Sequence, residues 1–154
     1  MRTVARQSNL LVVARESVSP EELRQRLREE CRRQGLEFGL LFDAVEGGFT
    51  FTARTIPNAF NVMPLVVYKV YADGRPDELV RGVDLIGTPL TTFAHIVAAS
   101  SEVGVFNGIC GAESGNIPVS ASSPSLLVSR IEVQKKAKSD ERPPILPPPF
   151  VQSE

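Results

Sequence analysis

Hydrophobic and polar residues change their spacing several times along the chain, and each change marks an expected element. Leu10–Val13 is a short apolar run between polar residues, which predicts a buried strand. From residue 20 to about residue 34 the apolar positions recur at every fourth residue, which predicts an amphipathic helix with a narrow buried stripe. The residues of this stripe are Leu23, Leu27 and Cys31.

The ends of this helix carry recognisable signals. Ser19 is expected to be the N-cap, Pro20 occupies the first turn, and Glu22 completes a capping box. Gly35 is placed to end the helix. The many arginines on the other faces are interpreted as a solvated surface rather than an anion site.

From residue 36 the period changes to two, which is typical of strands. Residues 36–42 and 49–55 predict a hairpin with its turn at Glu46–Gly48. A further strand is expected over Asn61–Tyr71, with Pro64 at a sheet edge or a bulge. This edge is also a possible place for an extended peptide to add as a strand.

The middle of the chain predicts one more strand and a second helix. Asp73-Gly74 is a strong turn signal before a strand over 77–85. Thr88-Pro89 then repeats the cap-and-proline signal, and helical spacing continues to about Ser100. This helix is expected to pack on the sheet, and its lone histidine, His95, is interpreted as a packed or surface-edge residue.

The glycine-rich stretch from Gly108 to Ser120 combines unusual backbone, a thiol and an acid. Gly108, Cys110, Gly111 and Glu113 lie within it, and it predicts an irregular loop between strands. A brief strand over 103–106 should lead into the loop. Strands over 117–121 and 126–133 should leave it.

Together these elements predict an α+β fold, with a mostly antiparallel β-sheet and two packed helices, in a single domain over residues 1–134. Residues 135–154 are rich in lysine and proline. Because proline joins neither a sheet interior nor a helix interior, this segment is expected to be an extended or disordered tail.

Composition narrows the function classes. The 154 residues carry a formal net charge of -1, which disfavours nucleic acid as a partner, and no apolar run is long enough to span a membrane. Two cysteines and no secretory signal agree with a reducing, cytoplasmic location. With one histidine, most metal and acid–base catalytic sets cannot be assembled from this sequence alone.

Cys110 has three interpretations from the residues alone. It is an inert small residue, a nucleophile, or a metal ligand. A nucleophile needs a nearby base, and the only histidine is expected on a different element. A zinc site needs three or four ligands, and only Glu113 is near in sequence, so spacing favours the inert interpretation.

An ordered set of motifs makes the metal-ligand interpretation of Cys110 more favourable than spacing alone does. The segments 77–89, 106–111, 117–120 and 123–126 read DELVRGVDLIGTP, FNGICG, IPVS and SPSL. Together they resemble the C-terminal region of the TldD/PmbA family, named as modulators of DNA gyrase and regarded as zinc metallopeptidases. The resemblance is clearest from about Val62 to Gln134.

The resemblance implies a role for Cys110. Active members of the family carry a His-Glu-x-x-x-His helix earlier in a longer chain, and a cysteine in a glycine-flanked C-terminal loop completes their zinc site. Cys110 matches that cysteine, so the resemblance implies that it is a zinc ligand beside histidines from another segment. Gly108, Gly111 and Glu113 are then candidate loop or substrate-binding residues.

The sequence departs from the family pattern because it contains no His-Glu-x-x-x-His motif. The chain is therefore expected to be inactive alone, as a fragment, a separately encoded half or a truncated relative. Its expected partners are the remainder of a longer chain or a homologous subunit, with a peptide as substrate. The alternative is a non-catalytic assembly module or the inactive partner of a two-subunit protease.

Overall fold

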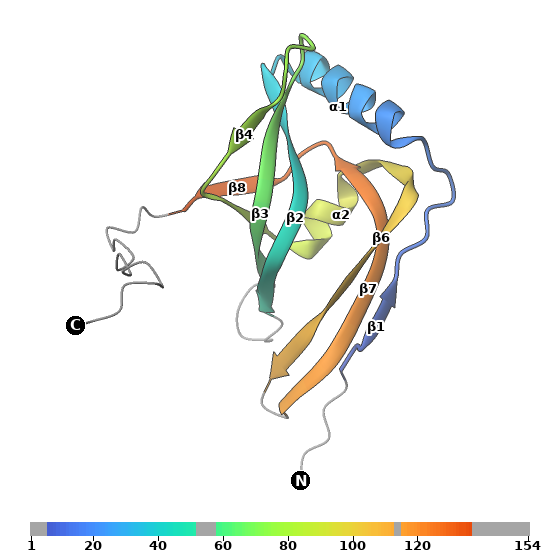
Figure 1. The fold of residues 1–154 in the computed structure, drawn as a ribbon, viewed down its shortest axis with the longest axis vertical. Helices are drawn as coiled ribbons and strands as arrows, with labels where there is room; N and C mark the ends of the chain where they lie inside the picture. The colour runs from blue at the N-terminus through green and yellow to red at the C-terminus, as the bar shows by residue number, and fades with distance from the viewer. Residues whose placement is uncertain (1–5, 52–57, 113–114, 137–154) are drawn as a thin grey trace, which may run out of the picture.

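The fold is seen in a computed structural model, which describes residues 6–51, 58–112 and 115–136 (Figure 1). Its elements in chain order are β1 (Asn9–Leu11), α1 (Pro20–Gln34), β2 (Phe38–Phe51), β3 (Ala59–Tyr71), β4 (Glu78–Val80), β5 (Val83–Gly87), α2 (Pro89–Ala94), β6 (Ile96–Ala112), β7 (Gly115–Val128) and β8 (Glu132–Lys135). The fold is α+β with mainly antiparallel strands, as the sequence predicts.

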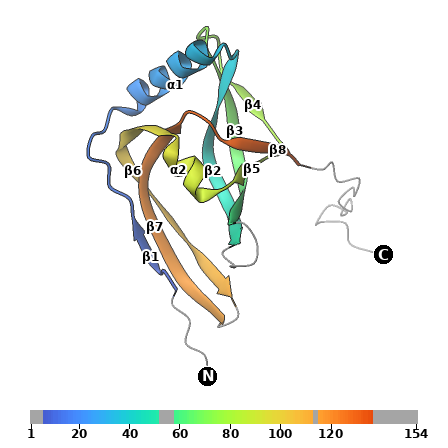
Figure 2. The same cartoon turned by 180° about the vertical axis from the view of Figure 1, so that it is seen from behind.

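The strands form two sheets rather than one. One sheet has the order β1-β7-β6, and β1 pairs with β7 in parallel. The other has the order β2-β3-β5-β8, with β4 paired to β3. Figures 1 and 2 show the two sheets side by side with α1 across one end, and the β6–β7 hairpin extends past the far ends of β2 and β3.

Helix α1 has the bounds and caps that its sequence predicts. The Ser19 side chain accepts a hydrogen bond from the backbone N–H of Glu22, at 3.1 Å. Gly35 ends the helix with φ at 70°, a left-handed conformation that a Cβ would disfavour. Three of the five arginines in the helix form ion pairs: Arg24 with Asp77, Arg26 with Glu22, and Arg33 with Glu30.

The predicted turn at Glu46–Gly48 is wrong. Strand β2 continues through these residues and pairs with β3 along its length, with register shifts between Phe42 and Gly47. Gly48 is required by close packing, because a Cβ there would lie 2.3 Å from the carbonyl oxygen of Asn61. The glycines therefore mark an irregularity within one long strand instead of its end.

Strand β3 is confirmed, but it is not an edge. It pairs with β2 on one side and with β4 and β5 on the other, so the predicted peptide-binding edge at Asn61–Tyr71 does not exist there. Pro64 lies at the irregular part of the β2–β3 ladder, as expected for a residue without a backbone N–H. The strand predicted over 77–85 is divided into β4 and β5 by Gly82, whose φ is 73°.

The second helix is shorter than predicted. It ends at Ala94, and the apolar residues that continue its helical spacing, Ile96 and Val97, begin β6. Leu90 and Phe93 are exposed, so the expected packing of this helix on the sheet is wrong. Short apolar runs do not distinguish a helix from a strand by spacing alone.

The first and last strands also differ from expectation. The predicted buried strand at 10–13 is β1, which is one residue shifted and largely exposed. Strand β7 runs without a break through Ser122–Ser125, where the sequence predicts a loop. Serine and proline are poor strand formers, so their pairing with β6 overrides local preference.

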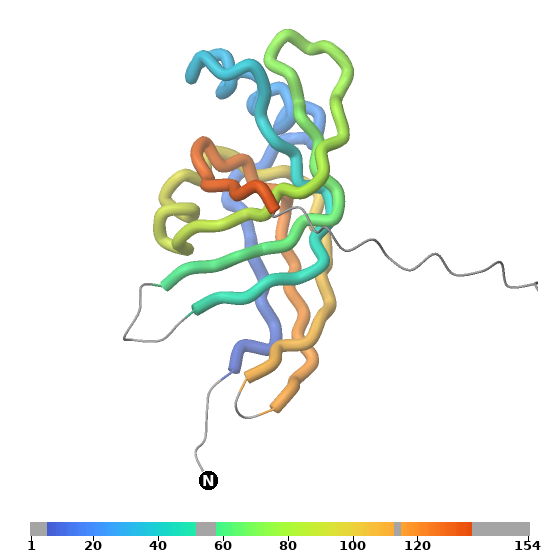
Figure 3. The backbone as a smooth tube through the Cα atoms, turned by 90° about the vertical axis from the view of Figure 1, so that its left-hand side faces the viewer, coloured from blue at the N-terminus to red at the C-terminus, as the bar shows by residue number. Residues whose placement is uncertain are grey.

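The buried core lies at the α1 end of the molecule. Besides Cys31 of α1, the buried residues come from β3, the turn that follows it, β6 and β7. These residues are Val67, Val70, Tyr71, Ala72, Ala99, Ser100 and Leu127. Figure 3 shows α1 and the adjoining strands at this end, with the strands diverging away from it.

Candidate functional site

Cys110 lies in a regular strand, not in the predicted loop. It is the third residue from the end of β6, and it pairs with Ile117 of β7. The ladder runs without a shift from Val103 to Ala112, opposite Pro124 to Gly115. The two strands therefore connect through residues 113–114 alone, and Cys110 is held close to the tip of a hairpin.

The glycines around Cys110 lie in regular strand, and at Gly108 the space for a side chain is filled by a neighbouring ring. Gly108 and Gly111 have no positive φ, so neither is required by an unusual backbone conformation. A Cβ on Gly108 would lie 2.8 Å from the Phe106 ring, which covers this position. The candidate loop residue Glu113 lies outside the described residues.

The N-terminal segment fixes the tip of this hairpin. The Arg6 guanidinium donates to the carbonyl oxygen of Gly115 at 3.0 Å and also to the carbonyl oxygen of Cys110. One charged side chain thus joins both strands beside the cysteine. This contact could not be read from the sequence, because 104 residues separate Arg6 from Cys110.

The structure separates His95 from Cys110. His95 is the C-cap of α2 and directly precedes β6, while Cys110 is near the opposite end of that strand. The His95 Nδ1 hydrogen bonds to the carbonyl oxygen of Thr91 at 2.6 Å. His95 is thus tied to its own helix, in agreement with the interpretation that it is a surface-edge residue.

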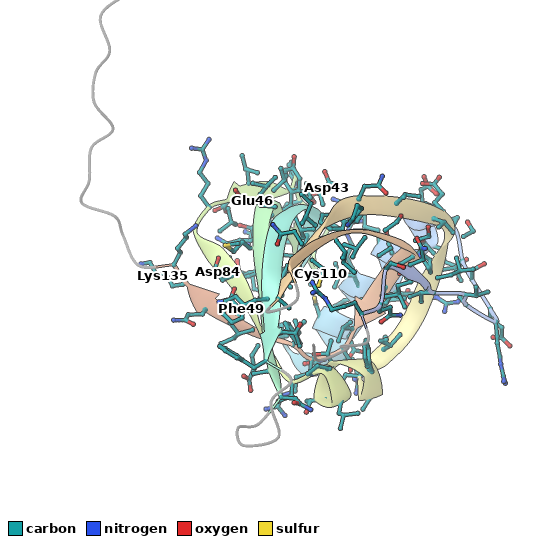
Figure 4. All side chains as sticks on the ribbon, turned by 90° about the horizontal axis from the view of Figure 1, so that it is seen from below. Asp43, Glu46, Phe49, Asp84, Cys110 and Lys135 are labelled. Atoms are coloured by element: carbon teal, nitrogen blue, oxygen red, sulfur yellow. The ribbon has the colours of Figure 1, made fainter. Side chains whose placement is uncertain are left out.

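Cys110 is a possible ligand but not a complete site. No group of three or more His, Cys, Asp and Glu side chains is assembled among residues 6–51, 58–112 and 115–136. Figure 4, which looks up at the hairpin tip from below, shows Asp84 and Lys135 to one side of Cys110, on β5 and β8. A thiolate is a soft donor of the kind that binds zinc, so the chemistry of Cys110 fits a single zinc ligand.

The second cysteine provides a contrast. Cys31 lies on the buried face of α1 and is 3% exposed. Burial raises the pKa of its thiol. Its side chain packs against Gly39 of β2, where an added Cβ would lie 3.0 Å from its sulfur. Cys31 therefore acts as a small core residue, while Cys110 remains partly accessible.

An apolar cavity of about 520 Å³ lies between α1 and the two sheets. Its walls include Leu23 and Leu27 of α1, Phe42 of β2, and Leu126 and Val128 of β7. These are core-facing side chains that the described residues do not fully pack. The cavity is distinct from Cys110, which is not among its lining residues.

A polar cluster that sequence reasoning missed lies at the turn between β3 and β4. Tyr71 donates a hydrogen bond to Glu78, which also pairs with Lys69 at 2.9 Å. These bonds lower the pKa of Glu78 and raise the pKa of Tyr71. Arg75 stacks 3.7 Å from the centre of the Tyr71 ring. The contacts are internal and anchor the turn, whose Asp73-Gly74 pair was its only sequence signal.

Comparison with known proteins assigns no class to this chain. No known family matches the sequence, and no curated protein matches it. Within the described ranges, neither helix is both long and apolar enough to cross a membrane.

Proposed function

We propose that this chain is the C-terminal domain of a TldD/PmbA-like zinc metallopeptidase and that it supplies Cys110 as one zinc ligand. The proposal rests first on the ordered sequence motifs that resemble this family. The observation that supports it in the fold is the placement of Cys110, a partly accessible thiol near the tip of a hairpin whose two strands Arg6 joins.

The remaining ligands come from a histidine-bearing segment, in the remainder of a longer chain or in a homologous subunit. The described residues assemble no group of three metal-binding side chains, so we expect the chain to be inactive alone. Zinc bound in the assembled site would lower the pKa of a bound water and so favour hydrolysis of a peptide bond. The role of this chain is to hold the thiolate in place.

Zinc retention tests the proposal. The chain is mixed with a segment carrying the His-Glu-x-x-x-His helix, loaded with zinc, dialysed against zinc-free buffer and analysed for bound metal. We expect zinc to be retained only in the mixture and to be lost with Cys110→Ser. The matched control is Cys31→Ser, which removes the buried thiol and should leave retention unchanged. Equal zinc retention by the Cys110→Ser chain would overturn the assignment.

The second candidate is a non-catalytic assembly module. It is favoured by the outer face of β6, where Val103, Val105 and Ile109 are all exposed. An apolar face of this kind is typical of an interface. A stable complex with the histidine-bearing segment that forms equally well without metal and with Cys110→Ser would support this candidate instead.

A further inference from the structure

The long strand β6 is an unprotected sheet edge. It is the outermost strand of the sheet β1-β7-β6, and over Val103–Ala112 no described residue pairs with its free side. Among its 17 residues the only charged side chain is Glu102, and it contains no proline. Proteins normally protect such an edge with charges, prolines or bulges, because its free backbone groups pair readily with another strand.

The other long edge shows what protection looks like. Strand β2 is also outermost in its sheet, but it carries Asp43 and Glu46 and three register shifts, whereas the two register shifts of β6 lie before Val103 and leave 103–112 regular. Figure 4 shows both carboxylates on this strand. Over residues 103–112, β6 therefore lacks the charges and register shifts that protect the edge of β2.

The hydrogen bonds of β7 fix which groups on β6 are free. The Ser120 N–H donates to Ser8 at 2.8 Å, and the Ser122 carbonyl accepts from Val12 at 2.9 Å, so both serines point toward β1. Their partners on β6 are Asn107 and Val105. In an antiparallel ladder such pairs direct their backbone groups to opposite outer sides. The free backbone groups of β6 therefore belong to Val103, Val105, Asn107, Ile109 and Gly111.

This set of residues is complementary to itself. An antiparallel two-fold axis through Asn107 places Val105 opposite Ile109 of a second copy and Val103 opposite Gly111. On the other face, Phe106 comes opposite Gly108 of the second copy. The axis brings no like charges together, and it satisfies the five free residues of each copy with about ten backbone hydrogen bonds.

We propose that β6 pairs with β6 of a second copy of this chain, which joins the two three-stranded sheets into one continuous sheet. A two-fold contact uses the same patch on both copies, as most homodimers do. The outer faces then form a continuous apolar strip from the exposed side chains Val103, Val105 and Ile109 of each copy, which are 57%, 62% and 73% exposed in the single chain. The association needs neither zinc nor a histidine-bearing segment, so its failure would leave the proposed function standing.

Cross-linking tests the register. In a chain with Cys31→Ala and Cys110→Ser, Asn107→Cys places two thiols across the two-fold axis, with Cα atoms about 5.5 Å apart, within disulfide range. We expect mild oxidation to link most of this variant into dimers. Val105→Cys and Ile109→Cys alone should link poorly, because each thiol lies about 13 Å from its own copy. An equimolar mixture of these two variants should link well.

Sedimentation tests the edge itself. The wild-type chain should sediment at twice 16.8 kDa at tens of micromolar. Asn107→Pro removes a backbone N–H that donates to neither neighbour within the chain, so the hairpin should fold and the dimer should dissociate. Asn107→Ala, which keeps the N–H, should stay dimeric. A monomeric wild-type chain, a dimeric Asn107→Pro variant with native circular dichroism, or strongest linking at Val105→Cys or Ile109→Cys alone would each overturn the proposal.

Discussion

The two long hairpins of this molecule, β2–β3 and β6–β7, are built alike and covered differently. Both pair over more than ten positions in antiparallel register. Helix α1 contacts the near ends of both hairpins, but the β2–β3 hairpin contains Val70, the most deeply buried side chain of the described chain. The β6–β7 hairpin holds its buried residues only near its base and is exposed on the outer face of β6.

This difference indicates that one part of the molecule stabilises the fold and another part is available to bind a partner. Apolar side chains that are removed from water stabilise the fold, while those that stay exposed are available to a partner. The stabilising part of the molecule is thus the α1 end. The part available for binding is the outer half of β6, which also carries Cys110.

The largest expected effect concerns the two valines that represent these regions. Val70 is 0% exposed, and Val70→Ala should lower the free energy of unfolding by about 2–3 kcal/mol through lost burial and a cavity. Val105→Ala, at an exposed position, should lower it by less than about 0.5 kcal/mol in dilute solution. Urea denaturation of both variants checks the difference. Equal losses would show that the hairpins contribute alike.

Two glycines give the next comparison. Gly48 of β2 has no room for a Cβ, which would lie 2.3 Å from the Asn61 carbonyl oxygen, so Gly48→Ala should cost about 1–2 kcal/mol. Gly104 of β6 has its nearest neighbour, the Ser123 carbonyl oxygen, at 3.9 Å. Gly104→Ala should therefore leave the thermal midpoint almost unchanged. A larger loss at Gly104 would contradict the described spacing.

The cap of α1 has a smaller expected effect. Ser19→Ala removes the acceptor of the Glu22 N–H and should cost about 1 kcal/mol. Ser19→Asp keeps an acceptor and serves as the matched control. Because α1 contacts only the near ends of the two hairpins, hydrogen exchange should accelerate there, in β3 near Tyr71, and should change little at the distant β6–β7 tip. Uniform acceleration in both sheets would mean that α1 stabilises them equally.

A pH dependence is expected at the end of α1. The pKa of Glu30 is lowered from 4.5 to about 2, chiefly by a side-chain hydrogen bond from Arg33 and then by one from Gln34. A lowered carboxyl pKa stabilises the folded state above the unfolded value, so this contribution is full above pH 4.5 and is lost as the pH falls toward 2. Urea midpoints of wild type and Glu30→Gln should therefore converge over this range. A gap that stays constant with pH would contradict the assignment.

The sequence predicts local features better than long-range ones. The bounds and caps of α1 follow from Ser19, Pro20 and Gly35, because these signals act within one turn. The glycines at Gly47 and Gly48 resemble a turn signal but lie inside a strand, because the partner strand β3 decides where β2 ends.

At the candidate site, too, the sequence predicts the local feature but not the long-range contacts. The sequence singles out Cys110, but its strand pairing with Ile117 and its contact with Arg6 depend on residues distant in the chain. The free edge of β6 also depends on topology, since no local pattern reveals which strand is outermost. The described residues assemble no group of three metal-binding side chains, so the other ligands of the proposed zinc site do not follow from this fold either.

Cobalt(II) binding tests the central claim, that Cys110 is the metal ligand, most directly. Cobalt takes the place of zinc in tetrahedral sites, and a bound thiolate produces an intense charge-transfer absorption. We expect this band when the chain is mixed with the His-Glu-x-x-x-His segment, and we expect Cys31→Ser to keep it and Cys110→Ser to lose it. A band that persists in Cys110→Ser, or no band in a mixture that binds cobalt, would contradict the account.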